Sequence, residues 1–315
     1  MSLQTVQPMA PAREAADATK GRGATLFHHN KPAWLFLAPF AFFYVLFLIW
    51  PTIYMFVSSF FNTSIVKPGL GTFAGLANYQ EMLTKSEFWS SMWHTLQFTL
   101  LTVPPLVILA FLFAILVNRL KRGQTFFRIA FFVPFILPSA TISLIWLFIY
   151  TPGNGLLAQV QTWFGSEAPS PVLATPSLAM LGIAITTVWW TIGFNFILYL
   201  AALQDVPREL YEAASVDGAS PWQQIRLITI PLLSRTTTLV VVLQIIASLK
   251  IFDQVYLMTS GGPGISTQVA LGLVTNTAFT DFRAGAASAA AVLLFIVILV
   301  IAALRQLTER SERTV

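Results

Sequence analysis

The sequence predicts an all-α polytopic membrane protein with six transmembrane helices. The chain of 315 residues is 56% hydrophobic and only 10% charged, which is more apolar than a soluble domain of this size requires. Uncharged runs extend from Lys31 to Lys67, Glu87 to Arg119, Arg128 to Glu167, Glu167 to Asp205 and Arg283 to Arg305. Each run matches or exceeds the roughly 20 residues that cross a bilayer core.

These runs, and one further run that Lys250 and Asp253 interrupt, place the helices at about residues 33–61, 91–117, 126–150, 178–203, 236–258 and 286–304. The first run is too long for a signal-peptide core and has no small-residue cleavage site, so we expect a retained helix. Pro104-Pro105 predicts a kink in the second helix, and Pro134 with Pro138 predicts a kink in the third.

The distribution of basic residues predicts the orientation in the membrane. If the N-terminus is cytoplasmic, the outer loops hold only Lys67, Lys85 and Arg283, and Lys250 lies in a helix. The other 14 of the 18 basic residues are then on the inner side. This asymmetry follows the positive-inside rule, so the net charge of +5 does not indicate nucleic-acid binding. We expect both termini in the cytoplasm.

Composition divides the chain into three parts. Residues 1–32 have no apolar period and predict a disordered cytoplasmic segment. Residues 33–305 form the transmembrane domain, and residues 306–315 form a cytoplasmic tail. Residues 61–90 and 151–177 are expected to be outer loops, the first with a short helix at 78–84, and a glycine-rich turn at 260–264 marks a third.

Residues 203–235, the polar loop, are the one substantial loop expected on the cytoplasmic side. They predict two short helices. Asp205 is expected to cap the first, with Pro207 in its opening turn, and Gly218 stands where that helix would stop. The segment Ser220-Pro221-Trp222-Gln223 has the pattern of a capping box for the second helix, and Pro231 is expected to end it.

The sequence offers no catalytic chemistry of its own. It has no cysteine, its three histidines, His28, His29 and His94, form no ligand cluster, and we expect no metal site. No glycine-rich loop ends in Gly-Lys-Ser or Gly-Lys-Thr, so nucleotide phosphates are not held in that way. We therefore predict a protein that is not an enzyme and needs no cofactor.

Polar residues recur along one side of the fourth and fifth helices, and polar groups inside spans tend to face protein or a cavity. Hydroxyl and amide groups beside aromatic rings suit a neutral sugar. The alternative is hydrogen bonding between helices without contact to any transported molecule. The candidates are Thr187, Trp190, Thr191, Phe194 and Asn195 on the fourth helix, and Gln244, Ser248, Ile251 and Phe252 on the fifth.

Lys250 and Asp253 are three residues apart in the predicted fifth helix. A functional interpretation makes them a substrate or coupling pair. We favour a local ion pair near the outer end of the helix, where the lysine ammonium can reach the interface.

Two stretches resemble a known family. Glu212-Ala213-Ala214, with Gly218 and then Ile228-Thr229-Ile230-Pro231, resembles the EAA signature of permease subunits of binding-protein-dependent ABC importers. The stretch from Phe252 to Pro263, Phe-Asp-Gln-Val-Tyr-Leu-Met-Thr-Ser-Gly-Gly-Pro, is similar to one that marks the carbohydrate-uptake branch, whose permeases carry maltose, other oligosaccharides and glycerol-3-phosphate. The resemblance extends from about residue 33 to the C-terminus.

The resemblance implies a type I ABC importer permease fold in a bacterial or archaeal inner or plasma membrane. The implied partners are a second permease, two ATP-binding subunits and an extracytoplasmic solute-binding protein. The polar loop would dock on an ATPase subunit and carry its closure into the membrane. The expected coupling residues are Glu212, Ala213, Ala214, Asp217 and Gly218. The alternative for this helix is an amphipathic helix that lies on lipid, which the acidic residues disfavour.

We therefore predict a permease subunit that forms half of the pathway for a sugar or oligosaccharide. In the family, substrate-lining residues lie on the fourth and fifth helices, at about the depths of the candidates above. A phosphorylated polyol such as glycerol-3-phosphate is the alternative substrate. The rival functions are an ion-coupled secondary carrier that uses Lys250 and Asp253, and a membrane scaffold without a pathway.

Overall fold

A computed structural model describes residues 31–312 except residues 68, 121 and 167–169. It divides into two compact units, residues 1–55 and residues 56–315. Most of the segment predicted to be disordered, residues 1–32, lies outside the described residues. Four described helices are long and apolar enough to cross a membrane, and there are up to six spans if each of two bent helix pairs is one span.

The first unit is one long helical segment. It consists of α2 (Lys31–Tyr44), a π-helical turn η1 (Val45–Ile49) and α3 (Trp50–Ser58), the last of which continues into the second unit. None of the most apolar window of Phe36–Ser58 is buried within the structure. A helix that is apolar on every side requires lipid or another protein around it.

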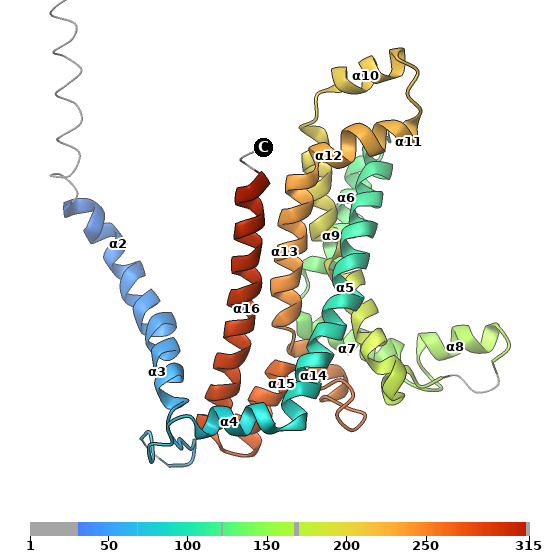
Figure 1. Ribbon diagram of the computed structural model, residues 1–315. Coiled ribbons are helices and arrows are strands. Elements are labelled where there is room, and N and C mark those ends of the chain that lie inside the picture. The colour runs from blue at the N-terminus through green and yellow to red at the C-terminus, as the bar shows by residue number, and fades with distance from the viewer. Residues whose placement is uncertain (1–30, 68, 121, 167–169, 313–315) are drawn as a thin grey trace, which may run out of the picture. The chain divides into compact units, whose positions relative to one another are not determined.

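In the second unit, the helices α5 (Ser86–Asn118) and α9 (Pro176–Gln204) pack most extensively, α6 and α13 pack against them, and α16 lies beyond α13 and packs on α4 and α15 (Figure 1). α6 covers Gln124–Ile136, α13 covers Ser234–Leu249 and α16 covers Ala284–Glu312. The main core lies between α5, α9 and α13 and includes Leu106, Ala110, Phe196, Tyr199 and Val240. α16 continues beyond its predicted end at residue 304.

Two predicted helices are interrupted. The predicted third helix consists of α6 followed by α7 (Ser139–Ile149), and the two are bent by 97° at the short break that contains Pro138. The predicted fifth helix, 236–258, ends at Leu249, and α14 (Asp253–Thr259) begins after a short break. α5, by contrast, is uninterrupted through Pro104-Pro105.

The short helices gather at opposite ends of the second unit (Figure 1). One end carries α4 (Ala77–Thr84), α8 (Leu156–Trp163), α14 and α15 (Ala270–Thr275), together with the turns η2 (Val172–Ala174) and η4 (Asn276–Thr280). The other end carries the polar loop with its helices α10 (Arg208–Val216), α11 (Pro221–Gln224) and α12 (Ile230–Leu232). α16 also ends on the polar-loop side.

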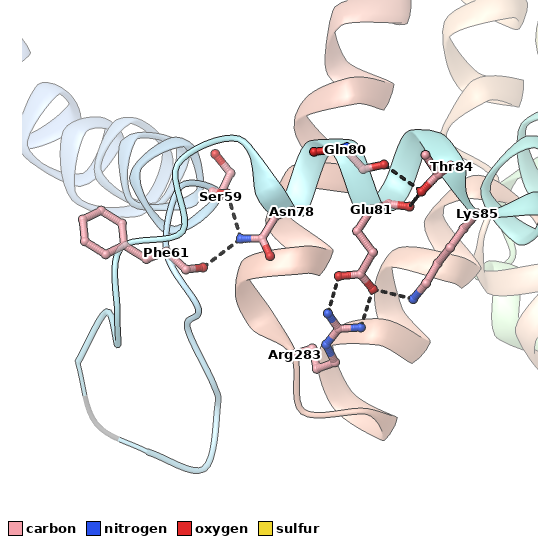
Figure 2. Close-up of polar contacts among 8 residues, drawn as sticks. All are labelled: Ser59, Phe61, Asn78, Gln80, Glu81, Thr84, Lys85 and Arg283. Carbon is pink, nitrogen blue, oxygen red and sulfur yellow. Dashed lines mark hydrogen bonds and ion pairs between the residues drawn. The ribbon is translucent and has the colours of Figure 1, made fainter.

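An ion cluster fastens α4 to the start of α16 (Figure 2). The guanidinium of Arg283 donates two hydrogen bonds to the carboxylate of Glu81, at 2.6 and 2.5 Å, and Lys85 Nζ lies 2.7 Å from Glu81 Oε1. The Asn78 amide, which is buried, donates to the carbonyls of Ser59 and Phe61 at 3.0 and 2.9 Å. These contacts fix α4 on both sides.

The close packing of α6 on α9 depends on Gly193. A Cβ atom at this position would lie 1.9 Å from the carbonyl oxygen of Phe131, so no larger residue fits without displacement of α6. We expect Gly193→Ala to destabilise the protein by about 1–3 kcal/mol through overpacking. Gly272→Ala is the matched control, because its Cβ meets nothing closer than 3.7 Å. Thermal unfolding of both variants in detergent tests this; equal midpoints would contradict it.

Stability at low pH should depend on Glu81. Hydrogen bonds from Arg283 and then from Lys85 lower the pKa of Glu81 from its ordinary value of 4.5 to about 2. A lowered pKa stabilises the folded state fully above pH 4.5, and this contribution is lost as the pH falls from 4.5 towards 2. We expect Glu81→Gln to lose about 1 kcal/mol at neutral pH, because solvent screens the cluster, and to flatten the pH dependence.

The measurement is the unfolding midpoint between pH 7 and pH 3. Glu87→Gln is the control, since Glu87 forms none of the ion pairs among the described residues. Parallel pH curves for wild type and Glu81→Gln would refute the prediction.

Candidate functional site

The first helix of the polar loop ends as predicted. Gly218 has a positive φ of 79°, and the amide of Ala219 donates to the carbonyl of Ala214 at 2.8 Å. The amide of Gly218 donates to the carbonyl of Ser215 at 3.1 Å, which completes a Schellman motif. The start differs from the prediction, because Pro207 is the residue before α10 and Asp205 instead follows the last residue of α9.

The second helix begins with the predicted capping box. The amide of Gln223 donates to Ser220 Oγ at 3.4 Å, and the amide of Ser220 donates to Gln223 Oε1 at 2.7 Å. Pro231 does not end this helix. The backbone passes through a π-helical turn, η3 (Ile225–Thr229), and through α12, and it bends by 66° into α13.

The predicted coupling residues form an exposed surface. Glu212, Ala213, Asp217 and Gly218 are exposed, Ala214 is partly buried, and a Cβ at Gly218 would meet no atom within 4 Å. Apolar side chains beside them are also exposed, with Val216 at 88%. Small residues flanked by carboxylates and exposed apolar groups are suited to docking another protein.

Two hydrogen bonds join α10 to the helix that follows it. The hydroxyl groups of Tyr211 and Thr229 lie 3.0 Å apart, and Gln224 Nε2 donates to Ser215 Oγ at 2.9 Å. Thr229 is buried. A force on α10 is therefore transferred to the segment that leads directly into α13.

Part of the predicted pathway is occupied by contacts between helices. Gln244 Nε2 on α13 donates to Asn195 Oδ1 on α9 at 2.9 Å, and both side chains are buried. Ser248 Oγ donates to Thr99 Oγ1 on α5 at 2.9 Å. For Asn195, Gln244 and Ser248 the geometry therefore matches the alternative interpretation, hydrogen bonding between helices without contact to a transported molecule. The sequence analysis missed Thr99, which lies in a run of threonines on α5.

Other candidates lie near the break in the third span. Trp190 Nε1 donates to the carbonyl of Leu137 at 3.2 Å, within the break. The ring of Phe135 stacks on Phe194 at 5.1 Å and lies 6.3 Å from that of Trp190. These partly buried rings offer flat apolar surfaces next to a polar backbone turn, the combination that binds sugar rings.

Thr187 joins this region to α14. Its hydroxyl lies 2.6 Å from Oε1 of Gln254, a residue that is 1% exposed and was missed by the sequence analysis. Thr191 donates to the carbonyl of Thr187 at 2.8 Å, within its own helix. Ile251 packs on the core beneath α14, and Phe252 stacks on Tyr256 at 5.3 Å.

The predicted ion pair between Lys250 and Asp253 is not formed. Ser139 Oγ, in the first turn of α7, donates to Asp253 Oδ2 at 3.1 Å, and the ion pairs among the described residues involve neither Lys250 nor Asp253. The reason is the end of α13 at Leu249, which removes the helical spacing that the prediction assumed. Asp253 thus links the break in the predicted third helix to the break in the predicted fifth helix.

A cavity of about 850 Å³ lies between α5, α6 and α9. Aliphatic and aromatic side chains line it, including Leu101, Phe113, Phe131 and Ile192. Such a lining suits lipid chains or another apolar helix rather than a sugar, whose hydroxyl groups need hydrogen-bond partners. Within the described residues, no group of three or more histidine or acidic side chains is placed to hold a metal ion.

The family model for the inner membrane component of binding-protein-dependent transport systems matches residues 67–314. The chain belongs to this family. The matched region of the permease contains the polar loop and both helices of the candidate pathway.

Individual relatives agree with the family. The sulfoquinovosyl glycerol transport permease SmoG of Agrobacterium fabrum is 35% identical over 80% of this chain and 82% of its own length. The trehalose/maltose transport permease MalF of Thermococcus litoralis is 34% identical over 68% and 73%. The sn-glycerol-3-phosphate transport permease UgpA of Agrobacterium fabrum is 30% identical over 84% and 90%.

Solved structures show the same fold. A chain of a bacterial ABC transporter for the import of the acidic polysaccharide alginate superimposes with a TM-score of 0.78 at 21% identity. The match covers 95% of this permease and 99% of that chain. The predicted permease family and helical fold are thereby confirmed, with four to six apolar spans among the residues that the structure describes.

The buried amide pair gives a test of the two interpretations of the pathway residues. We expect Asn195→Leu and Gln244→Leu each to cost about 1–3 kcal/mol, because each leaves a buried amide unpaired. The double variant should cost less than the sum of the two. Unfolding midpoints and solute uptake are measured together. Loss of uptake at unchanged stability would assign the pair to substrate binding instead.

Proposed function

We propose that this chain is the permease subunit of an ATP-driven importer and forms half of the translocation pathway for a sugar or oligosaccharide. The observation that carries the proposal is the family match over residues 67–314, which includes an exposed, capped α10 with the EAA residues. The relatives whose names include sugar transport support the substrate class.

We infer six membrane spans. α6 and α7 form one broken span, and α13, which α11 and α12 enter through the 66° bend, forms the fifth. The polar loop and both termini face the cytoplasm in this topology. The positions of the basic residues support it. The end of α16 on the side of the polar loop is consistent with it as well (Figure 1).

The proposed assembly contains a second permease, two ATP-binding subunits and an extracytoplasmic solute-binding protein, in a bacterial or archaeal inner or plasma membrane. The family description names the dependence on a binding protein. Among solved relatives, the alginate transporter was determined in complex with a periplasmic protein bound to alginate pentasaccharide. ATP hydrolysis belongs to the partner subunits, since the chain carries no phosphate-binding glycine loop.

Coupling is proposed to occur through α10. Closure of the ATPase subunits moves the surface formed by Glu212, Ala213, Ala214, Asp217 and Gly218. The Tyr211–Thr229 and Gln224–Ser215 contacts pass the movement to α11, α12 and α13. The spans then change from inward-facing to outward-facing while the binding protein delivers the solute.

A neutral sugar fits the lining better than an anion. Trp190 and Phe194 provide ring surfaces, and Thr187 and Thr191 provide hydroxyl groups. The candidate lining has no arginine, the side chain best suited to a phosphate group. Similarity to the sn-glycerol-3-phosphate permease UgpA keeps a phosphorylated polyol as the second candidate, with the second permease as the source of the cationic group.

Charge reversal in α10 tests the coupling. In the complete importer in lipid, we expect Glu212→Lys to reduce the ATPase activity stimulated by binding protein and sugar about tenfold, equivalent to 1.4 kcal/mol of interface free energy. Asp205→Lys is the matched control, because Asp205 is an exposed carboxylate in the same loop but outside α10. Equal stimulation of the ATPase activity in both variants would contradict a coupling role for Glu212. Uptake that persists without ATP would favour a secondary carrier.

A further inference from the structure

We propose that Gln254, on α14, is a specificity-determining residue for the transported sugar, and that the unpaired end of its side-chain amide binds a hydroxyl group of the solute. The inference rests on the proposed function and deepens it. It adds to the candidate pathway a residue that lies beyond the break at which α13 ends, outside the set of pathway residues that the sequence predicted.

The Gln254 side chain has one end paired and one end unpaired. The residue is 1% exposed. Its Oε1 lies 2.6 Å from Thr187 Oγ1 on α9, whereas its Nε2 is buried and has no hydrogen-bond partner among the described residues. Buried amide groups are normally paired, because an unpaired one loses its hydration without compensation. An apolar side chain of similar size would avoid this cost, so the amide calls for a partner that joins it at some stage of transport.

The Thr187 hydroxyl cannot satisfy both of its neighbours. It carries one hydrogen, but its oxygen lies 2.9 Å from the carbonyl oxygen of Ile183 and 2.6 Å from Gln254 Oε1. If the hydrogen is donated to Ile183, the Gln254 amide pairs with Thr187 only when it is turned so that Nε2 donates. Oε1 is then the unpaired atom. Both orientations of the amide therefore leave one polar end of Gln254 free for another group.

A second unpaired donor lies in the same packed region. Trp146 Nε1, on α7, is buried and has no hydrogen-bond partner among the described residues. Trp146 packs against the core cluster that contains Ile183 and Val255. Ile183 lies about one turn before Thr187 on α9, and Val255 directly follows Gln254 on α14. Two N–H groups without acceptors thus indicate a polar group that binds between α7, α9 and α14.

A hydroxyl group is the ligand that suits this region. It both donates and accepts, so it pairs with either orientation of the Gln254 amide, and its oxygen can also accept from an N–H group. The side chains of Gln254, Thr187 and Trp146 are neutral and offer no cation to a phosphate group. Trp190 and Thr191 follow Thr187 by about one turn of α9, so a sugar bound to them brings its hydroxyl groups towards the Thr187–Gln254 pair.

Access to Gln254 requires movement of the segments that cover it. Its Nε2 is enclosed in this structure, and both α7 and α14 begin after a break, the first at Pro138 and the second after Leu249. The two helices pack on each other, and the hydrogen bond from Ser139 to Asp253 joins their first turns. Opening of this contact, when the spans change state, exposes the Gln254 amide. Gln254 therefore binds the solute in a state other than the one observed.

The test replaces Gln254 by leucine in the complete importer, reconstituted in liposomes with its solute-binding protein and a labelled sugar that this protein binds. Maltose and trehalose, the sugars named for the relative MalF, are the first probes. We expect ATP-dependent uptake per folded importer, at saturating binding protein, to fall about tenfold through the loss of one hydrogen bond to the solute. The unfolding midpoint should not fall, because leucine removes the unpaired amide and Thr187 keeps its hydrogen bond to Ile183.

Two glutamines provide matched controls. Gln244→Leu is the control for stability, because that amide is buried and paired with Asn195, so the same substitution should lower the unfolding midpoint. Gln159→Leu is the control for uptake. Gln159 is exposed on α8, outside the candidate pathway, and its replacement should leave uptake unchanged.

Monodeoxy analogues of the transported sugar test the hydroxyl contact directly. The analogue that lacks the hydroxyl group bound by Gln254 should be taken up at the same rate by wild type and by Gln254→Leu. The other analogues should keep the tenfold difference, because their contact with Gln254 is intact in the wild type.

Unchanged uptake per folded importer in Gln254→Leu overturns the inference while the proposed function stands. Reduced uptake together with a lowered midpoint would assign Gln254 to a structural role, with a resident water as the partner of its amide, and also overturn it. A tenfold difference for every deoxy analogue would have the same consequence. If the wild type shows no ATP-dependent uptake of any sugar that its binding protein binds, the proposed function itself is contradicted.

Discussion

Hydrogen bonding of the backbone in an apolar bilayer is the constraint on which this structure depends. Every break in a span exposes carbonyl and amide groups that lipid cannot satisfy, so a break is tolerated only where protein or a polar cavity supplies partners. The predicted third helix breaks at Pro138, and the Trp190 indole donates a hydrogen bond to the carbonyl of Leu137. The predicted fifth helix breaks after Leu249, where the amides of Lys250 and Ile251 donate to the carbonyls of Ala247 and Ser248. Ser139 at the first break also donates to Asp253 at the second. The two breaks thus stabilise each other.

Proline explains where the helices change their winding. Two of the π-helical turns, η1 and η3, each end two residues before a proline, at Pro51 and Pro231 respectively. A proline in a helix lacks the amide hydrogen and its ring crowds the preceding turn. A wider turn just before it relieves this crowding. Proline also breaks the helix between α6 and α7, at Pro138. It does not break α5, where Pro104-Pro105 lies inside a well-packed helix. Whether a proline breaks its helix therefore depends on how tightly the neighbouring helices pack around it.

The polar loop could be predicted from the sequence because its structure depends on neighbouring residues. The side-chain partners in the membrane helices could not, because they depend on contacts between residues far apart in the sequence. The Ser220 capping box and the Gly218 stop depend on residues within a few positions, so the sequence alone predicts them. The partner of Asp253 could not be predicted, because Ser139 is 114 residues away. Spacing along a helix predicted a Lys250 pair, and the end of α13 removed that spacing. Periodicity likewise identified Asn195 as a polar position but could not say whether it faces solute or Gln244.

These contacts define which parts of the proposed pathway can move. α13 begins at the bend that follows the polar loop and ends at the break before α14. Along its length, Gln244 binds α9 and Ser248 binds α5, so α13 is fixed to the two central helices by buried hydrogen bonds. A displacement of α10 must therefore move α13 together with its partners or exchange those bonds. Beyond the break, α14 is tied to α7 by the hydrogen bond from Ser139 to Asp253 and to α9 by the hydrogen bond from Thr187 to Gln254. Relative movement of α13 and α14 therefore requires an exchange of these two hydrogen bonds, one of which involves the candidate pathway residue Thr187.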